Sequence, residues 1–289
     1  MPTLTSKLGA LQRGGMQSLK EASIDTAALD ARLLLCHATG MSHEQLVANS
    51  DDVIEPETQS RFLELIERRR QGEPVGRIMG CREFWGLEFD LGPETLEPRA
   101  DSEAIVEATL SWIENRNASL RILDLGTGSG CLLLSLLAEC PNARGLGIDV
   151  SAPALSVARS NAGRLGLADR AEFQKGIWAD GLEGTFDIII SNPPYIPTLE
   201  VQSLSREVRD HDPARALDGG TDGMECYREI VQQLPERLCQ GGIAALETSP
   251  DLYTELRELV ENVGQFRMIE GIKDMAGRDR GLRFRKHKT

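Results

Sequence analysis

The sequence ILDLGTGSGCLLLSLLAEC, residues 122–140, joins a strand-like apolar run to an apolar helix through a glycine-rich turn. The turn consists of Gly126, Thr127, Gly128, Ser129 and Gly130. Glycines at alternate positions allow a tight turn and let a ligand approach the backbone closely. In an α/β sheet such a turn lies at the carboxyl ends of the strands, where ligands bind. This stretch therefore predicts both the fold class and the position of a ligand site.

The chain on either side of this turn alternates between strand-like and helical patterns. Further strands are expected at 143–150, 186–191 and 241–248, and further helices at 152–166 and 251–264. Strands that alternate with helices indicate a parallel sheet covered on both faces. Residues 101–289 are therefore expected to form one α/β domain that carries the ligand site.

The first part of the chain has a different pattern. Residues 1–80 contain helical spacings of apolar residues, as in DTAALDARLLLCHATG, which ends at Gly40, a plausible helix C-cap. In residues 81–100, apolar and polar residues nearly alternate, as in a strand, and Gly86 interrupts this pattern. We predict a small N-terminal helical bundle over 1–80, which helps to recognise the substrate, and a hairpin linker over 81–100.

The glycine pattern indicates which ligand the turn binds. A dinucleotide site needs G-x-G-x-x-G, and the third glycine would then fall at Cys131. The pattern here is G-x-G-x-G, which suits a cofactor without a pyrophosphate. Asp149 ends the next strand, where a carboxylate can accept both hydroxyls of a ribose. Its alternative role is to cap the helix that starts near Ser151.

A second motif follows the strand FDIIIS (186–191) directly. The tetrapeptide Asn192-Pro193-Pro194-Tyr195 cannot continue a central strand, and two prolines fix its backbone. The Asn192 side-chain oxygen and the Pro193 carbonyl could accept both N–H bonds of a planar NH2 group, and Tyr195 could stack on that group. Such acceptors stabilise the charge that develops when an amide-type nitrogen attacks a methyl group. The alternative is an ordinary turn at the end of a strand.

Composition narrows the class of protein. The net charge of −13 disfavours a large nucleic-acid interface. The basic tail, residues 278–288, is expected to be a solvated end. No apolar run approaches the ~20 residues of a membrane span, and no signal-peptide core is present, so a cytoplasmic protein is expected. The six cysteines and four histidines have no metal-site spacing, so we expect no metal and mostly buried, reduced thiols.

The two motifs, in this order, resemble those of class I methyltransferases. The segments EPVGRIMGCREFWGLEFDL, EPRADSE (97–103), DLGTGSG and NPPYI together resemble the HemK/PrmC family over roughly residues 20–285. The resemblance implies a Rossmann-like, mostly parallel seven-stranded sheet behind a helical N-terminal domain. It implies an S-adenosylmethionine-dependent enzyme that methylates the side-chain amide nitrogen (N5) of the glutamine in the Gly-Gly-Gln loop of class 1 peptide chain release factors.

The resemblance also implies roles for individual residues. Gly126–Gly130, Asp149, Trp178 and Asn192 would contact the cofactor, with Trp178 flanking the adenine unless it is simply a core aromatic. Asn192–Tyr195 would hold the glutamine amide, and Arg99 would contact the substrate. The sequence departs from the family pattern at Glu97, at Ala100 and at Thr248-Ser249, which puts the rigidity of those segments in doubt.

Three alternatives remain at this stage. An adenine-N6 methyltransferase of nucleic acids would use the same motif on a flipped base. A related enzyme would methylate a glutamine of a ribosomal protein. A cofactor-binding module without catalysis would be expected to have lost the Asn-Pro-Pro-Tyr motif. We expect a monomer that acts on a protein and binds neither DNA nor a membrane.

Overall fold

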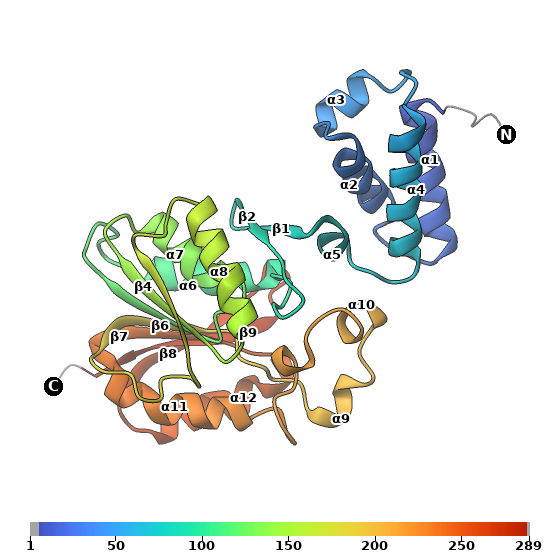
Figure 1. The fold of residues 1–289 in the computed structure, drawn as a ribbon. Helices are drawn as coiled ribbons and strands as arrows, with labels where there is room; N and C mark the ends of the chain where they lie inside the picture. Colours follow the sequence, from blue (N-terminus) through green and yellow to red (C-terminus); the bar gives the residue numbers. More distant parts are fainter. Residues whose placement is uncertain (1–5, 288–289) are drawn as a thin grey trace. The chain divides into compact units, whose positions relative to one another are not determined.

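The computed structural model describes residues 6–287, which form two compact units (Figure 1). One unit contains the described residues up to Gly80 together with Arg206–His211. The other contains Cys81–Ser205 and the described residues from Asp212 onward. The roles predicted for the two parts of the chain stay predictions.

The first unit is a bundle of helices, as expected. Its helices are α1 (Leu8–Glu21), α2 (Ala27–Thr39), α3 (His43–Ala48), α4 (Pro56–Arg70), α5 (Val75–Met79) and α10 (Arg206–Arg209). Gly40 ends α2 with a left-handed φ of 70°, the conformation that a residue with a Cβ avoids. Ser42 and Gln45 form a capping box at the start of α3. Local sequence thus defines the helix boundaries.

Packing in this unit depends on one close approach and one buried ion pair. A Cβ on Gly15 of α1 would lie 2.6 Å from the ring of Phe62 in α4, so only glycine lets these helices meet here. Arg69 is buried and pairs with Asp30 at 2.7 Å and with Glu207 of α10 at 2.7 Å. Because a buried charge without partners is costly, these carboxylates stabilise Arg69 in place.

The second unit contains the predicted seven-stranded sheet and a separate hairpin. The hairpin pairs β1 (Cys81–Phe84) with β2 (Leu87–Asp90). The sheet consists of β3 (Arg121–Leu125), β4 (Arg144–Asp149), β5 (Ala171–Lys175), β6 (Phe186–Ser191), β7 (Leu238–Glu247), β8 (Phe266–Lys273) and β9 (Asp279–Lys286). Its order is β5-β4-β3-β6-β7-β9-β8, with β9 antiparallel to both of its neighbours and all other pairs parallel.

Helices cover both faces of this sheet (Figure 1). The helices α6 (Glu103–Ser111), α7 (Cys131–Glu139) and α8 (Ala152–Arg164) pack on one face, and α11 (Glu225–Arg237) and α12 (Tyr253–Asn262) on the other. Ile188 and Ile190 of β6 face the first group, whereas Ile189 between them faces the second. Since successive strand residues point to opposite faces, an unbroken apolar strand is what a doubly covered sheet requires.

Three strands of the sheet were not predicted from the sequence. They are β5, β8 and β9. The expectation that residues 278–288 form a solvated basic end is wrong for the part that the structure describes, because β9 lies between β7 and β8. Arg283 stacks over Trp112 at 4.4 Å and pairs with Glu270 at 2.8 Å, while Arg285 donates to the Trp112 carbonyl at 2.7 Å. These arginines bury their stems against the sheet, which a charge count could not reveal.

None of the helices within residues 6–287 is long and apolar enough to cross a membrane. All six cysteines are unpaired, but only Cys140 is fully buried, so the thiols are less buried than expected.

Candidate active site

The glycine turn forms the floor of the site. Gly126, Gly128 and Gly130 have φ values of +74°, +55° and +83°, a region that favours glycine at all three positions. The backbone amides of Gly126 and Thr127 both donate to the Ile148 carbonyl at 2.9 Å. The end of β4 therefore holds the turn in place, and Gly130 begins α7 as its N-cap.

Asp149 connects the turn to the following helix. Its Oδ2 accepts a hydrogen bond from the Gly128 amide at 2.9 Å, and its Oδ1 accepts one from the Ser151 amide at 2.8 Å. The N-cap of α8 is Ser151 itself, whose hydroxyl accepts from the Ala154 amide. Each carboxylate oxygen of Asp149 has lone pairs left for further donors. The carboxylate can thus both organise the turn and receive a ligand hydroxyl.

A cavity of about 290 Å³ opens above the turn. The predicted residues that line it are Arg99, Gly126, Thr127, Gly128, Ser129, Asp149, Trp178, Asn192 and Pro194. Gly130, Pro193 and Tyr195 do not line it, although they are adjacent in the chain to residues that do. The two motifs from the sequence therefore share one cavity at the carboxyl ends of β3, β4 and β6.

Trp178 contributes one wall of this cavity. Its backbone has φ +48°, which is uncommon for a residue with a Cβ. Its indole nitrogen donates to Glu229 at 2.6 Å, and a Cβ on Gly126 would lie 3.5 Å from its ring. Trp178 is partly exposed rather than a buried core residue, so its ring can flank a ligand.

The Asn-Pro-Pro-Tyr segment is braced by a loop that sequence reasoning missed. The Ile196 amide donates to the Leu217 carbonyl at 2.9 Å, and the Gly219 amide donates to the Ile196 carbonyl at 2.8 Å. A Cβ on Gly219 would lie 2.7 Å from Cα of Tyr195. The glycine-rich sequence DGGTDG (218–223) was the available signal for this close approach. Tyr195 itself packs against the core, and burial raises the pKa of its phenol.

Asn192 has a defined orientation. Its Nδ2 donates to the hydroxyl of Ser102 at 3.4 Å, so the amide nitrogen is engaged and Oδ1 remains available as an acceptor. Ser102 is buried and ends the short helix η1 (Ala100–Ser102). Sequence reasoning did not single out Ser102, because an isolated serine carries no pattern.

The loop before η1 departs from the family pattern but is firmly held. Asp212 is buried, its Oδ1 accepts from the Glu97 amide at 3.3 Å, and its other oxygen pairs with the Arg99 guanidinium. Glu97 also lies 3.6 Å from Arg82 of β1. These polar contacts fix the segment that carries Arg99, although Ala100 stands where the family usually has proline.

Two buried carboxyl groups lie near the site. Burial raises the pKa of Asp124, in β3, to about 7, and the charge of Asp149 adds to this effect. Its Oδ2 accepts from the Thr127 hydroxyl at 2.6 Å, whereas Oδ1 has no hydrogen-bond partner among the described residues. Burial likewise raises the pKa of Glu247, at the end of β7, to about 7.

These features together define a class I methyltransferase. They are a mostly parallel seven-stranded sheet, a glycine turn after its first strand, a carboxylate after the second strand and Asn-Pro-Pro-Tyr after the fourth. Comparisons with known proteins identify the family within this class. A family model described as PrmC N-terminal domain matches residues 10–80, and one described as methyltransferase domain matches residues 116–268.

The similar relatives are named consistently. A release factor glutamine methyltransferase from Rhodospirillum rubrum is 45% identical over 95% of this chain and 84% of its own length. One from Agrobacterium fabrum is 43% identical over 93% of each chain. A solved methyltransferase from Pyrococcus furiosus has a TM-score of 0.53 at 22% identity over 76% of this chain and 97% of its own, which supports the fold alone. The chain belongs to the release factor glutamine methyltransferase family.

Proposed function

We propose that this enzyme transfers a methyl group from S-adenosylmethionine to the side-chain amide nitrogen (N5) of the glutamine in the Gly-Gly-Gln loop of class 1 peptide chain release factors. The observation that carries the proposal is the engaged Nδ2 of Asn192, which leaves Oδ1 as an acceptor beside the cavity. Family membership and the names of the relatives support the same substrate.

The residues present fit this cofactor. The cavity has open backbone at the glycine turn for a close approach, and Asp149 retains lone pairs for the two ribose hydroxyls. Trp178 would flank the adenine. When bound, S-adenosylmethionine supplies a methyl group activated by a sulfonium. No metal is needed for such a transfer.

The Asn192–Tyr195 segment would position the substrate amide. Oδ1 of Asn192 and the Pro193 carbonyl would accept the two N–H bonds of the glutamine side chain, while Tyr195 would supply a flat face. An amide nitrogen is a weak nucleophile because its lone pair is delocalised. Two fixed acceptors stabilise the positive charge that develops on nitrogen and align it for the attack. The proton can leave afterwards, so no strong base is required. Arg99 would contact the protein substrate at the rim of the cavity.

The partner is proposed to be a protein, bound by a monomeric enzyme in the cytoplasm where release factors act. The net charge of −13 makes a DNA substrate unfavourable, because affinity for phosphates comes mainly from Lys and Arg. A glutamine of a ribosomal protein offers the same amide to Asn192, so an assay must compare the two substrates directly.

One assay tests the proposal. Labelled S-adenosylmethionine is offered with a release factor, with the same factor whose loop glutamine is replaced by alanine, with ribosomal proteins and with DNA. We expect label on the intact release factor alone. Equal labelling of the altered factor, or stronger labelling of ribosomal protein or DNA, would refute the proposed substrate.

A further inference from the structure

The short turn of residues 99–102 carries the hydroxyl that orients the Asn192 side chain. Nδ2 of Asn192 donates to the Ser102 hydroxyl at 3.4 Å, and Ser102 is only 3% exposed. The Ser102 amide donates to the Arg99 carbonyl at 3.0 Å, which closes the turn. Arg99 and Ser102 both line the cavity. The position of this turn therefore affects how Asn192 is presented to a substrate.

Two ion pairs hold the turn at alternate residues. The Arg99 guanidinium pairs with the buried carboxylate of Asp212. The carboxylate of Asp101 pairs with Arg280 of β9 at 2.5 Å. The turn contributes a cation to one pair and an anion to the other, so the two pairs cannot exchange partners. Because Ser102 directly follows Asp101, the second pair fixes the end of the turn that contacts Asn192.

Arg280 is held through both its backbone and its side chain. Its carbonyl accepts a hydrogen bond from the Thr248 amide, just after β7, at 2.8 Å. A Cβ on the neighbouring Gly281 would lie 2.8 Å from Cδ1 of Ile105, so the backbone of β9 lies close against α6. The side-chain Nε donates to Asp274 at 3.0 Å. Arg280 thus reaches toward η1 from a fixed point at the start of β9.

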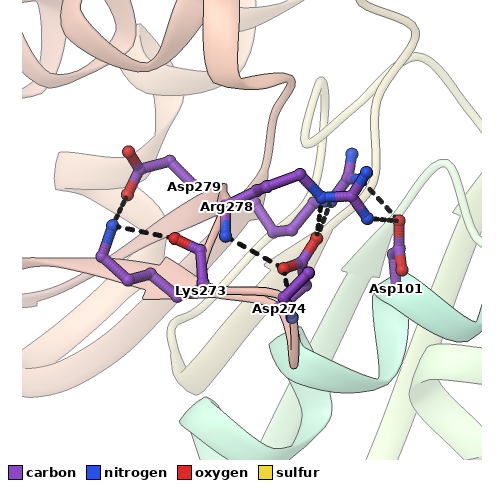
Figure 2. A network of polar contacts seen from close by, with 8 residues as sticks. Asp101, Lys273, Asp274, Arg278 and Asp279 are labelled. Carbon is purple, nitrogen blue, oxygen red and sulfur yellow. Dashed lines mark hydrogen bonds and ion pairs between the residues drawn. The ribbon is translucent and has the colours of Figure 1, made fainter.

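Asp274 connects the turn between β8 and β9 to this arginine (Figure 2). Its side chain is only 4% exposed. Oδ1 accepts from the amides of Ala276 and Arg278 at 2.9 and 3.0 Å, and Oδ2 accepts from Nε of Arg278 at 2.7 Å as well as from Arg280. Figure 2 shows Asp101 reaching from the η1 segment toward this cluster. Because a buried carboxylate is costly without donors, these contacts hold the Arg280 guanidinium in one orientation.

The two arginines of the cluster contact the same two carboxylates but are not equivalent. Arg280 is 16% exposed and lies 2.5 Å from Asp101, whereas Arg278 is 55% exposed and lies 3.4 Å from it. Water and salt screen exposed ion pairs, which therefore contribute little. A guanidinium presents its donors in a rigid fork, so Arg280 can bind Asp274 and Asp101 at once. Of the two arginines, Arg280 is thus the one that fixes Asp101.

We propose that Arg280 is a positioning residue for the reaction at Asn192. Held by Asp274, it fixes Asp101 and thereby keeps the Ser102 hydroxyl in contact with Nδ2 of Asn192. Oδ1 of Asn192 then stays available as the acceptor for the substrate amide. The inference rests on the proposed function, because it assigns that task to Oδ1. Arg280 does not line the cavity, so it acts only through η1.

The first readout needs neither cofactor nor substrate. In the ligand-free, ¹⁵N-asparagine-labelled full chain, the side-chain NH2 signals of Asn192 are assigned by their loss in Asn192→Asp. Arg280→Met keeps a long stem but removes both ion pairs, and we expect it to move these signals by more than their linewidth. Ser102→Ala should also move them, and adding Arg280→Met to Ser102→Ala should move them no further. Unmoved signals in Arg280→Met, or an equal further displacement in the Ser102→Ala background, would overturn the proposal.

The second readout is turnover on release factor. Arg280→Met should lower kcat by about tenfold, less than loss of a direct contact, with a smaller change in KM. Asp101→Asn keeps the shape of the side chain but removes its charge, so it should lower kcat as well, though by less. Because both residues act through one ion pair, the double variant should be no slower than Arg280→Met alone. Multiplicative losses in the double variant would overturn the proposal.

Two other cations of the β8–β9 hairpin provide graded controls. Lys273 pairs with Asp279 across the hairpin at 2.8 Å (Figure 2). Lys273→Met removes a charge and an ion pair from the same element and should leave the Asn192 signals and kcat unchanged. Arg278→Met removes the exposed arginine of the cluster and should lower kcat by less than about twofold. An effect of either control as large as that of Arg280→Met would indicate a general charge effect and would overturn the proposal.

Cofactor affinity separates positioning from a merely structural role. Asp149 and Trp178 belong to other elements, so Arg280→Met should bind S-adenosylhomocysteine within about twofold of the wild type. A large loss of affinity would mean that the cluster supports the whole domain, and would overturn the proposal. The two hypotheses fail separately. Displaced Asn192 signals in Arg280→Met without methyl transfer by the wild type would refute the proposed function alone. Methyl transfer by the wild type with unmoved Asn192 signals in Arg280→Met would refute the positioning role alone.

Discussion

The backbone amide of Gly128 donates a hydrogen bond to Oδ2 of Asp149 at 2.9 Å, which ties the turn after β3 to the end of β4. The residue proposed to bind the ribose is thus also the residue that shapes the cofactor site. Removing its carboxylate has two consequences, because the ligand loses an acceptor and the turn loses a brace.

Asp149→Ala should therefore weaken cofactor binding by about 1.5–3 kcal/mol or slightly more, the range for hydrogen bonds to a charged group. Calorimetry with S-adenosylhomocysteine measures the loss. Asp149→Asn keeps one acceptor oxygen and should fall between the wild type and the alanine variant. Equal affinity of the wild type and Asp149→Ala for the cofactor would show that Asp149 does not bind the ribose.

Asn192→Ala should reduce kcat by about 10²–10³, because a fixed acceptor matters most as charge develops on the substrate nitrogen. Cofactor affinity should change much less than turnover. Tyr195→Phe keeps the aromatic face and should lose less activity than Tyr195→Ala. Steady-state kinetics on release factor check both comparisons, and a change confined to KM in Asn192→Ala would contradict the assigned role.

The bracing loop can be tested by adding a single methyl group. Gly219→Ala places a Cβ 2.7 Å from Cα of Tyr195, so the Asn-Pro-Pro-Tyr segment must shift. We expect a loss of kcat of about tenfold or more, since small misplacements of positioning groups are costly. Gly163→Ala, in α8, is the control because its Cβ would meet nothing within 4 Å, and it should stabilise the helix by about 0.5–1 kcal/mol. Similar effects of both substitutions would refute the steric argument.

Glu247 also predicts a pH dependence of stability. Its pKa is about 7 in the folded protein against 4.5 as the ordinary value, so the folded state holds a proton between these values that the unfolded state has released. Stability attributable to this group therefore falls as pH rises from about 4.5 to 7 and stays low above that. Glu247→Gln should recover part of that loss, on the order of 3 kcal/mol at most, at pH 8, and almost none at pH 4.5. Urea unfolding at both pH values measures this, and an equal effect at each would contradict it.

The predicted recognition role of the N-terminal helices can be tested by truncation. A fragment that begins at Cys81 retains every residue that lines the cavity, so it should keep its affinity for S-adenosylhomocysteine. It should lose most activity on intact release factor while retaining some on a short Gly-Gly-Gln peptide. The fragment also leaves Glu207 without Arg69, so cofactor binding must be measured first as a check of folding. Full activity on intact release factor would show that residues 1–80 are not needed for recognition.

The sequence alone predicted those parts of the site that consist of consecutive residues. The glycine turn and Asn192–Tyr195 each depend on consecutive residues, so both were visible in the sequence. Ser102 was not recognised as a partner of Asn192, because the two meet only when η1 and the end of β6 come together. The strands β8 and β9 were missed for a related reason: register shifts interrupt their pairing, and their charged residues lie against other elements.

The order of the strands constrains how the sheet can be completed during synthesis. β9 follows β8 in the chain but lies between β8 and β7, so β8 cannot join the sheet until β9 has been made. A nascent chain that has reached only β8 therefore exposes the open edge of β7, a buried apolar strand in the finished protein. Open edges of this kind pair readily with other chains. The β8–β9 hairpin thus closes the sheet as a preassembled piece, and stalled translation just before it would leave an aggregation-prone intermediate.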